Sequence, residues 1–157
     1  MIYLTAWIIT GLLFLLLIFL KAYVKYQKNK IPTYPKKPII SKPEGEFFKV
    51  LKNVVGNEYD IFAQVQLVRL IDAPFRSVGW NKTSQKSVDF VLVDKNDFST
   101  KLVIELDGAS HRFANRIERD KLVDQILSNA KIPILHHPWQ QRYDLQNLRT
   151  LINSKLS

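Results

Sequence analysis

Hydrophobic and polar positions divide the chain of 157 residues into an apolar N-terminal stretch and a patterned remainder. Residues 2–20 carry no charge, and a helix of that length, at about 1.5 Å per residue, nearly spans the roughly 30 Å of hydrocarbon in a bilayer. A cleaved signal peptide normally begins with basic residues, whereas here the lysines follow the apolar run. The pattern therefore predicts a transmembrane anchor over residues 1–21 that is retained in the mature protein.

Residues 22–41 are expected to form a basic, proline-rich linker between that anchor and one folded domain over residues 42–157. Residues 1–40 contain six lysines and no acidic residue, so most of the net charge of +9 lies in the anchor and linker rather than in the domain. Because basic flanks stay on the cytoplasmic side, we expect a single-pass protein of the inner (cytoplasmic) membrane whose domain faces the cytoplasm. The absence of cysteine excludes disulfide bonds and thiolate zinc sites.

Alternating and helical spacings of apolar residues predict the order helix, three strands, helix, strand, helix in the domain. The expected elements are a helix over residues 42–55, a strand over 59–71, a polar loop over 72–86, strands over 88–93 and 101–107, a helix after Asn115, a strand over 132–136 and a helix capped by Asp144. Helices and strands that alternate in this way indicate an α/β fold. Trp80 and Trp139 are expected to anchor loops, with stacking on bases as the alternative.

The two middle strands carry three carboxylates within otherwise apolar runs, Asp89 in VDFVLV and both Glu105 and Asp107 in KLVIELD. If a hairpin pairs Val93 with Lys101, the antiparallel register places Asp89 directly opposite Glu105, roughly 5 Å away. Side chains two residues apart share a face, so Asp107 lies beside Glu105. Like charges at that distance repel where they are partly desolvated, and a divalent cation with oxygen ligands would compensate them. The alternative is that these acids are solvated strand ends.

The same residues resemble the PD-(D/E)XK nuclease superfamily. The likeness rests on Val88-Asp89-Phe90, on Ile104-Glu105-Leu106-Asp107-Gly108 with His111, and on Arg119-Asp120 in the next helix. Within that superfamily the chain is similar to the very short patch repair endonucleases and, over about residues 41–145, to the family called domain of unknown function 2726. The resemblance implies a restriction-endonuclease-like α-β-β-β-α-β core with a mixed sheet, preceded by one transmembrane helix.

The resemblance also implies roles for individual residues. Asp89 and Glu105 match the acidic pair that binds Mg²⁺ or Mn²⁺, and Asp107 stands where the superfamily usually has a lysine. His111 matches a histidine that takes part in catalysis in the repair-endonuclease branch, and Glu46 matches an acid in the first helix. The implied contacts to nucleic acid are made by Gln64 in the first strand and, as substitutes for the missing lysine at phosphate, by Lys82, Lys86 or Arg119.

These roles together describe the hydrolysis of phosphodiester bonds. Asp89, Glu105 and Asp107 hold a cation that lowers the pKa of a bound water, and His111 transfers the proton. The expected function is that of a membrane-anchored, metal-dependent endonuclease whose substrate is nucleic acid, with DNA favoured over RNA. Because Asp107 replaces the usual lysine, the alternative is an inactive nuclease-fold module that binds nucleic acid or a protein partner at the membrane.

Overall fold

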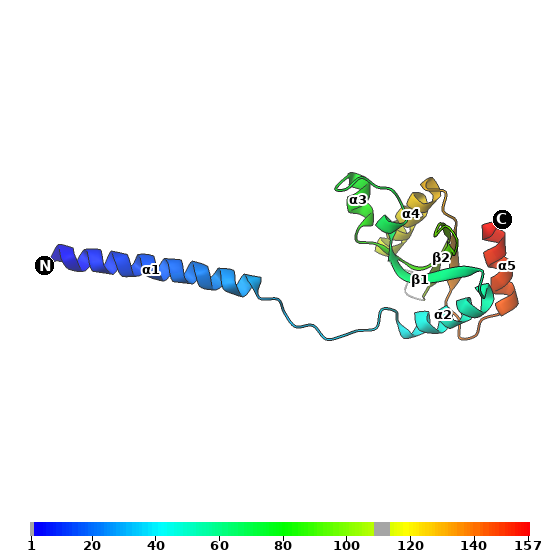
Figure 1. The fold of residues 1–157 in the computed structure, drawn as a ribbon, viewed down its shortest axis with the longest axis horizontal. Coiled ribbons are helices and arrows are strands. Elements are labelled where there is room, and N and C mark those ends of the chain that lie inside the picture. The colour runs from blue at the N-terminus through cyan, green and yellow to red at the C-terminus, as the bar shows by residue number, and fades with distance from the viewer. Residues whose placement is uncertain (1, 109–113) are drawn as a thin grey trace. The chain divides into compact units, whose positions relative to one another are not determined.

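The chain consists of two compact units, Met1–Lys37 and Pro38–Ser157. The computed structural model describes residues 2–108 and 114–157, and of residues 2, 78 and 114–119 it describes the backbone alone. The first unit contains helix α1 (Ile2–Asn29), which is long and apolar enough to cross a membrane (Figure 1). α1 continues past residue 21, where the predicted anchor ends, and takes in the first part of the predicted linker.

The second unit is built on one four-stranded sheet with the strand order β1-β2-β3-β4. Its strands are β1 (Tyr59–Gln66), β2 (Ser87–Asp94), β3 (Thr100–Asp107) and β4 (Ile134–Pro138). The β1–β2 and β2–β3 pairs are antiparallel, whereas β3 and β4 are parallel and therefore need a crossover, which α4 (Ala114–Asn129) provides. The predicted α/β class with a mixed sheet is confirmed.

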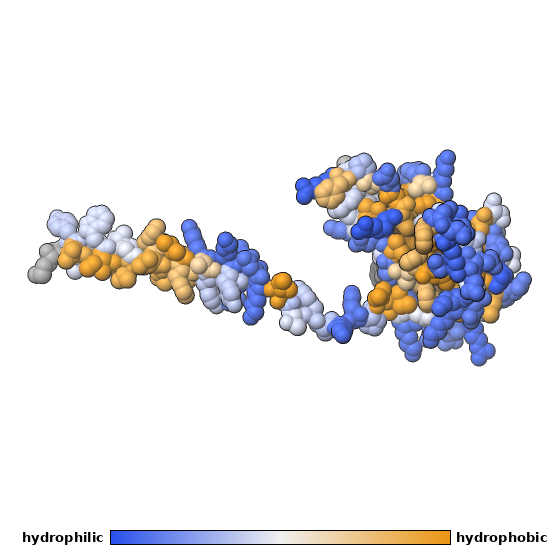
Figure 2. Space-filling view, viewed as in Figure 1, coloured by the Kyte–Doolittle hydropathy of each residue, from blue (hydrophilic) through white to orange (hydrophobic). Residues whose placement is uncertain are grey.

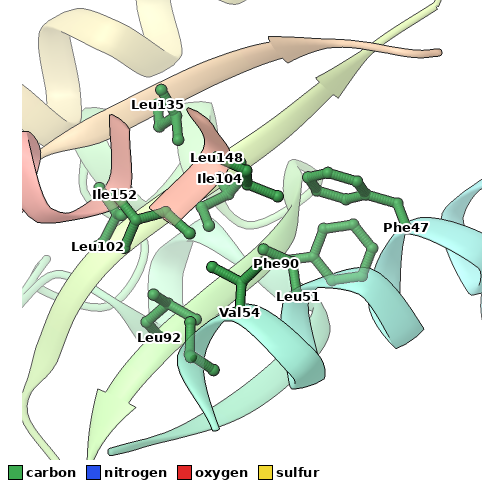
Figure 3. Close-up of a cluster of buried hydrophobic side chains, with 11 residues drawn as sticks. Phe47, Leu51, Val54, Phe90, Leu92, Leu102, Ile104, Leu135, Leu148 and Ile152 are labelled. Carbon is green, nitrogen blue, oxygen red and sulfur yellow. The ribbon is translucent and has the colours of Figure 1, made fainter. Parts of the chain in front are cut away.

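Helices cover both faces of this sheet. On one face α2 (Lys42–Val55) and α5 (Leu145–Leu156) pack over a core that Figure 3 shows in close-up. The fully buried members of this core are Phe47, Leu51, Phe90, Leu92, Leu102 and Ile104, with Leu148 and Ile152 close to fully buried. On the other face α4 contributes Val123 and Leu127 to a second core with Val88, Val91, Val93 and Val103. The near-continuous apolar runs of β2 and β3 follow from this burial on both faces.

Capping residues fix where the two helices on the first face begin. Ser41 and Glu44 form a capping box, since the Ser41 hydroxyl accepts from the Glu44 N–H and the Glu44 carboxylate accepts from the Ser41 N–H at 2.6 Å. Asp144 caps α5 as expected, accepting from the N–H groups of Gln146 and Asn147 at 3.0 and 3.1 Å.

Three sequence predictions about the β1–β2–β3 region were wrong in detail. The first strand ends at Gln66 rather than at residue 71, because a 3-10 turn, η1 (Leu67–Arg69), follows it. The predicted loop over residues 72–86 contains a short helix, α3 (Val78–Thr83), whose N-cap is Ser77. Val93 pairs with Thr100 instead of Lys101, because the register shifts between Leu92 and Val93, as happens at a β-bulge.

Candidate functional site

A row of apolar residues crosses all four strands at the middle of the sheet. Ala63 of β1 pairs with Phe90 of β2, Phe90 with Ile104 of β3, and Ile104 with Leu135 of β4. Phe90 and Ile104 are fully buried, and all four residues pack in the core below α2 and α5. We call Ala63, Phe90, Ile104 and Leu135 the apolar row.

One position further toward the same end of the sheet, each strand carries a polar residue. Glu105 pairs with His136. The β2–β3 pairing ends at Phe90–Ile104, and continuing its antiparallel register by one position would set Asp89 opposite Glu105. Gln64 faces Asp89 from β1, between the pairs formed by its two neighbours. We call Gln64, Asp89, Glu105 and His136 the polar row. The juxtaposition of Asp89 and Glu105 stays a prediction, and it requires the register of the Phe90–Ile104 pair to continue by one residue.

Asp89 is held by donors from both neighbouring strands. Its Oδ2 accepts from the backbone N–H of Leu106 at 2.9 Å, and its Oδ1 accepts from Gln64 Nε2 at 3.3 Å. Gln64 Nε2 also donates to Glu44 Oε1 at 3.4 Å, and Gln64 Oε1 accepts from the Ser87 hydroxyl at 3.3 Å. These half-buried groups fix the position of the Asp89 carboxylate, and they connect the start of α2 to three strands.

At this level the inward-facing side chains of β1 and β2 switch from one face of the sheet to the other. Ala63 and Phe90 pack below α2 and α5, whereas Val65 and Val88, two residues away on the same strands, pack on the α4 side. Strict alternation would keep residues two apart on one face, so the backbone departs from a regular strand between them. Gln64, which lies at this point, has a φ of 54°, in the left-handed region that costs free energy for a residue other than glycine.

The acidic residue that α2 contributes is Glu44 and not the predicted Glu46, which is exposed. Glu44 and Asp89 both accept from the same nitrogen of Gln64, so two carboxylates converge on one amide group. In the part of the chain that the structure describes, neither forms an ion pair with Lys, Arg or His. Together with Glu105, they give this end of the sheet an acidic character that would attract a cation.

Asp107 contacts the last member of the polar row, His136. His136 Nδ1 is 3.6 Å from Asp107 Oδ1, and His136 Nε2 is 2.9 Å from Asp124 Oδ1 on α4. Burial by itself would lower the pKa of His136, but the hydrogen bond to Asp124 and the charges of Asp124 and Asp107 outweigh it and raise the pKa. His137 is buried, and its ring lies 5.4 Å from that of Phe47.

Apart from Gln64 in β1, the predicted nucleic-acid contacts lie on the segment between β1 and β2 and on α4. Lys82 is exposed at the end of α3, and Lys86 is half-buried immediately before β2. Arg119 belongs to α4, but its side chain lies outside the described part of the structure, as does all of His111. Of the predicted residues, the structure therefore brings Gln64 and Asp89 into contact, with Glu105 on the adjacent strand β3.

The residues present at this site suit a magnesium ion. All side-chain donors at Asp89, Glu105 and Glu44 are oxygen atoms, which Mg²⁺ and Mn²⁺ prefer. Within residues 2–108 and 114–157, no three or more His, Cys, Asp or Glu residues form a group that could hold a metal by themselves. That is compatible with Mg²⁺, because this ion usually takes one or two carboxylates and completes its octahedron with water and substrate phosphate.

Comparison with known proteins gives one match. No curated protein and no solved structure matches the chain significantly. The model of one family, described as "Protein of unknown function (DUF2726)", matches residues 36–156, which include the whole sheet and all helices after α1. The chain therefore belongs to the DUF2726 family.

Proposed function

We propose that the domain is a Mg²⁺-dependent nuclease of the PD-(D/E)XK type that hydrolyses phosphodiester bonds in nucleic acid, with DNA favoured over RNA. The polar row is the single observation that carries the proposal. By the register of β2 and β3, it puts Asp89 and Glu105 on adjacent strands at the same end of the sheet, both in half-buried positions. The order α2, β1, β2, β3, α4, β4, with β3 parallel to β4, is consistent with the restriction-endonuclease-like core that the resemblance implies.

Asp89 and Glu105 are the residues that would hold the cation. Once bound, the cation would supply a water of lowered pKa and would neutralise charge on the phosphate. The N–H of Leu106 and the amide of Gln64 orient the Asp89 carboxylate, and a carboxylate held by two donors keeps other lone pairs for a further ligand. Such preorganisation lowers the cost of binding, because the side chain does not have to be ordered at that moment.

The protein's own groups would bind the substrate and move the proton. Hydrolysis adds a water oxygen to phosphorus and breaks the bond to the leaving oxygen, and the proton from the water needs an acceptor near Asp89. His111 remains our proposed acceptor. Lys86, half-buried two residues before Val88, and exposed Lys82 would contact phosphate in place of the lysine that Asp107 replaces. Asp107, which contacts His136, is the weakest of the three proposed metal ligands.

We place the domain at the cytoplasmic face of a membrane. α1 carries Lys21, Lys25 and Lys28 after its apolar part, and basic residues that flank a span stay on the cytoplasmic side. Fusing a reporter to the C-terminus that is active on one side of the membrane only would test this orientation.

A second candidate function is an inactive nuclease-fold module that binds nucleic acid or a protein partner. One observation favours it: both oxygens of Asp89 already accept hydrogen bonds from the protein, so the carboxylate is accommodated without a cation. Such a module would keep its affinity for nucleic acid when Asp89 loses its charge, and this affinity would fall steeply with salt.

Cleavage of labelled DNA by the full-length protein in detergent separates the two candidates. We expect cleavage that requires Mg²⁺ and that falls at least about 100-fold in Asp89→Asn, because the substitution keeps the shape of the side chain and removes its charge. Asp94→Asn is the matched control, since Asp94 lies at the turn end of the same strand. Cleavage that survives in Asp89→Asn, or that needs no divalent cation, would refute the nuclease proposal.

A further inference from the structure

The connection between β1 and β2 is much longer than its geometry requires. The last pair of these antiparallel strands is Gln66 with Ser87, and about two to five residues usually join such a pair, whereas here residues 67–86 do so. The segment is well ordered by its own contacts. Leu67 is fully buried, and its N–H donates to the Lys86 carbonyl at 2.8 Å, while the fully buried Thr83 donates to the Gly79 carbonyl at 2.9 Å.

This ordered segment holds an aromatic ring out in solvent. Phe75 is 70% exposed, and the edge of the Trp80 ring packs against it, with the ring centroids 4.9 Å apart and the planes at 74°. The Arg76 guanidinium lies 5.1 Å from the centre of the Phe75 ring, and Arg76 itself has a φ of 60°. We call Phe75, Arg76 and Trp80 the aromatic tip. Figure 2 shows apolar surface at the segment that carries α3, on the side of the domain away from α5.

Selection for stability alone would favour neither the exposed ring of Phe75 nor the positive φ of Arg76. An exposed phenylalanine gains little from folding, and a residue other than glycine with positive φ costs free energy. The Ser77 hydroxyl accepts from the Trp80 N–H at 3.1 Å, which fixes α3 and therefore the position of the Trp80 ring. The segment thus presents a rigid pair of aromatic rings with a cation beside them, and this arrangement costs conformational free energy.

The tip is attached next to the polar row. The connection leaves the sheet at Gln66 and Ser87, two residues beyond Gln64 and Asp89, which corresponds to roughly 7 Å along a strand. Ser87 also donates to Gln64, so the base of the connection is bonded to the site itself. Residues 67–86 contain four basic side chains and one acidic side chain, which favours a polyanion as the partner.

We propose that the aromatic tip is a stacking platform for an unpaired base, so that the substrate of the polar row is a nucleic acid with a single-stranded segment. This inference rests on the proposed nuclease function and specifies its substrate class. Unpaired bases stack on aromatic rings and on guanidinium planes, and the tip offers both, whereas bases within a duplex are covered by their neighbours. A membrane surface fits less well, because inserting Phe75 into lipid would carry the adjacent Arg76 guanidinium toward hydrocarbon.

Fluorescence anisotropy tests the proposal with a labelled 12-nucleotide single strand and the blunt duplex of the same sequence. The full-length protein is used in detergent with EDTA, so that no cleavage occurs. We expect Phe75→Ala to weaken binding of the single strand by about 5- to 100-fold and Phe75→Trp to restore it. Phe98→Ala is the control, because Phe98 is also 70% exposed and also has a positive φ, but lies in the β2–β3 turn. Its affinity should stay within about twofold of wild type.

Three results would overturn the stacking platform: equal affinity of Phe75→Ala and wild type for the single strand, tighter binding of the duplex than of the single strand, or no binding of either. A fourth would reassign the tip to the membrane. In this case the Phe75→Ala variant of the second unit (38–157), which holds every core residue, would lose retention on phosphatidylserine vesicles but keep its affinity for the oligonucleotide. If cleavage requires metal but Phe75→Ala does not weaken binding of the single strand, the stacking proposal fails and the nuclease proposal stands. If Phe75→Ala weakens binding of the single strand but no metal-dependent cleavage is found, the nuclease proposal fails and the stacking platform stands.

Discussion

The apolar row and the polar row lie one residue apart on the same four strands, yet they are supported in different ways. Phe90 and Ile104 of the apolar row are completely buried, and side chains from α2 and α5 surround them. Asp89 and Glu105 of the polar row are only half-buried, and the partners of Asp89 come from residues 17 and 25 positions away in the sequence. One row is therefore held by contact area, and the other by a few directional hydrogen bonds.

This difference indicates what each row contributes. Burial of an apolar side chain stabilises the fold roughly in proportion to its area, so the apolar row carries stability. Half-buried carboxylates contribute little stability and have to be held by donors, so their presence in two central strands needs another explanation. The irregular backbone at Gln64 belongs to the same level of the sheet, and strained residues cluster at functional sites.

The largest effect should come from the apolar row. Phe90→Ala removes a fully buried ring that packs against Phe47 at 5.7 Å, and it should lower the free energy of unfolding by about 3–5 kcal/mol. Phe98→Ala, at an exposed turn position, should change it by less than about 0.5 kcal/mol. Urea unfolding followed by circular dichroism measures both. A cost below about 1 kcal/mol for Phe90→Ala would mean that the apolar row is not the stabilising one.

A smaller effect is expected when the polar row loses its carboxylate. Asp89→Ala leaves the Leu106 N–H without its acceptor and removes one of the two acceptors of Gln64 Nε2, which should cost about 1–3 kcal/mol. Asp89→Asn keeps an acceptor oxygen and should cost less than Asp89→Ala in the same urea titration. If Asp89→Ala were as stable as wild type, the donors would not be holding this carboxylate, and the contrast between the two rows would fail.

The smallest effect concerns the pH dependence that His136 confers. Because its pKa is raised in the folded state, its contribution to stability is present below the unfolded pKa of about 6.5 and is lost as pH rises through the folded pKa. The side chain is 36% exposed, so after screening we expect no more than about 0.5 kcal/mol. Unfolding at pH 6 and at pH 8.5 without divalent cations should reveal this loss in wild type. A flatter profile is expected for Asp124→Asn, and an unchanged slope would contradict the assigned cause.

The elements that depend on local pattern were predictable from the sequence. The apolar runs of β2 and β3 and the helical spacing of α2 and α5 each identify an element without reference to the rest of the chain. The register of β2 against β3 over Phe90–Leu92 also followed, although the assumed pair of Val93 with Lys101 was wrong. The bulge moves only the turn end of the hairpin, so the error does not reach the site.

The parts that the sequence did not reveal depend on contacts between distant segments. A positive φ at Gln64 has no signature, because glutamine is not a residue that favours this region. Glu44 could have been found, since its place three residues after Ser41 marks a capping box and therefore the helix start. The contacts of His136 with Asp107 and Asp124 join three elements, and nothing in local spacing points to them.

Calorimetric titration of the full-length protein with Mg²⁺ and Mn²⁺ tests the central claim most directly, with Asp89→Asn/Glu105→Gln beside Asp94→Asn/Asp97→Asn. The second pair is the control, because Asp94 ends β2 and Asp97 lies in the β2–β3 turn, where they accept hydrogen bonds from the N–H groups of Asn96 and Ser99, respectively. We predict binding by wild type and by the turn variant, and no binding by the polar-row variant. Equal binding by both variants, or no binding by wild type even with an oligonucleotide present, would contradict the assignment of the polar row as a metal site.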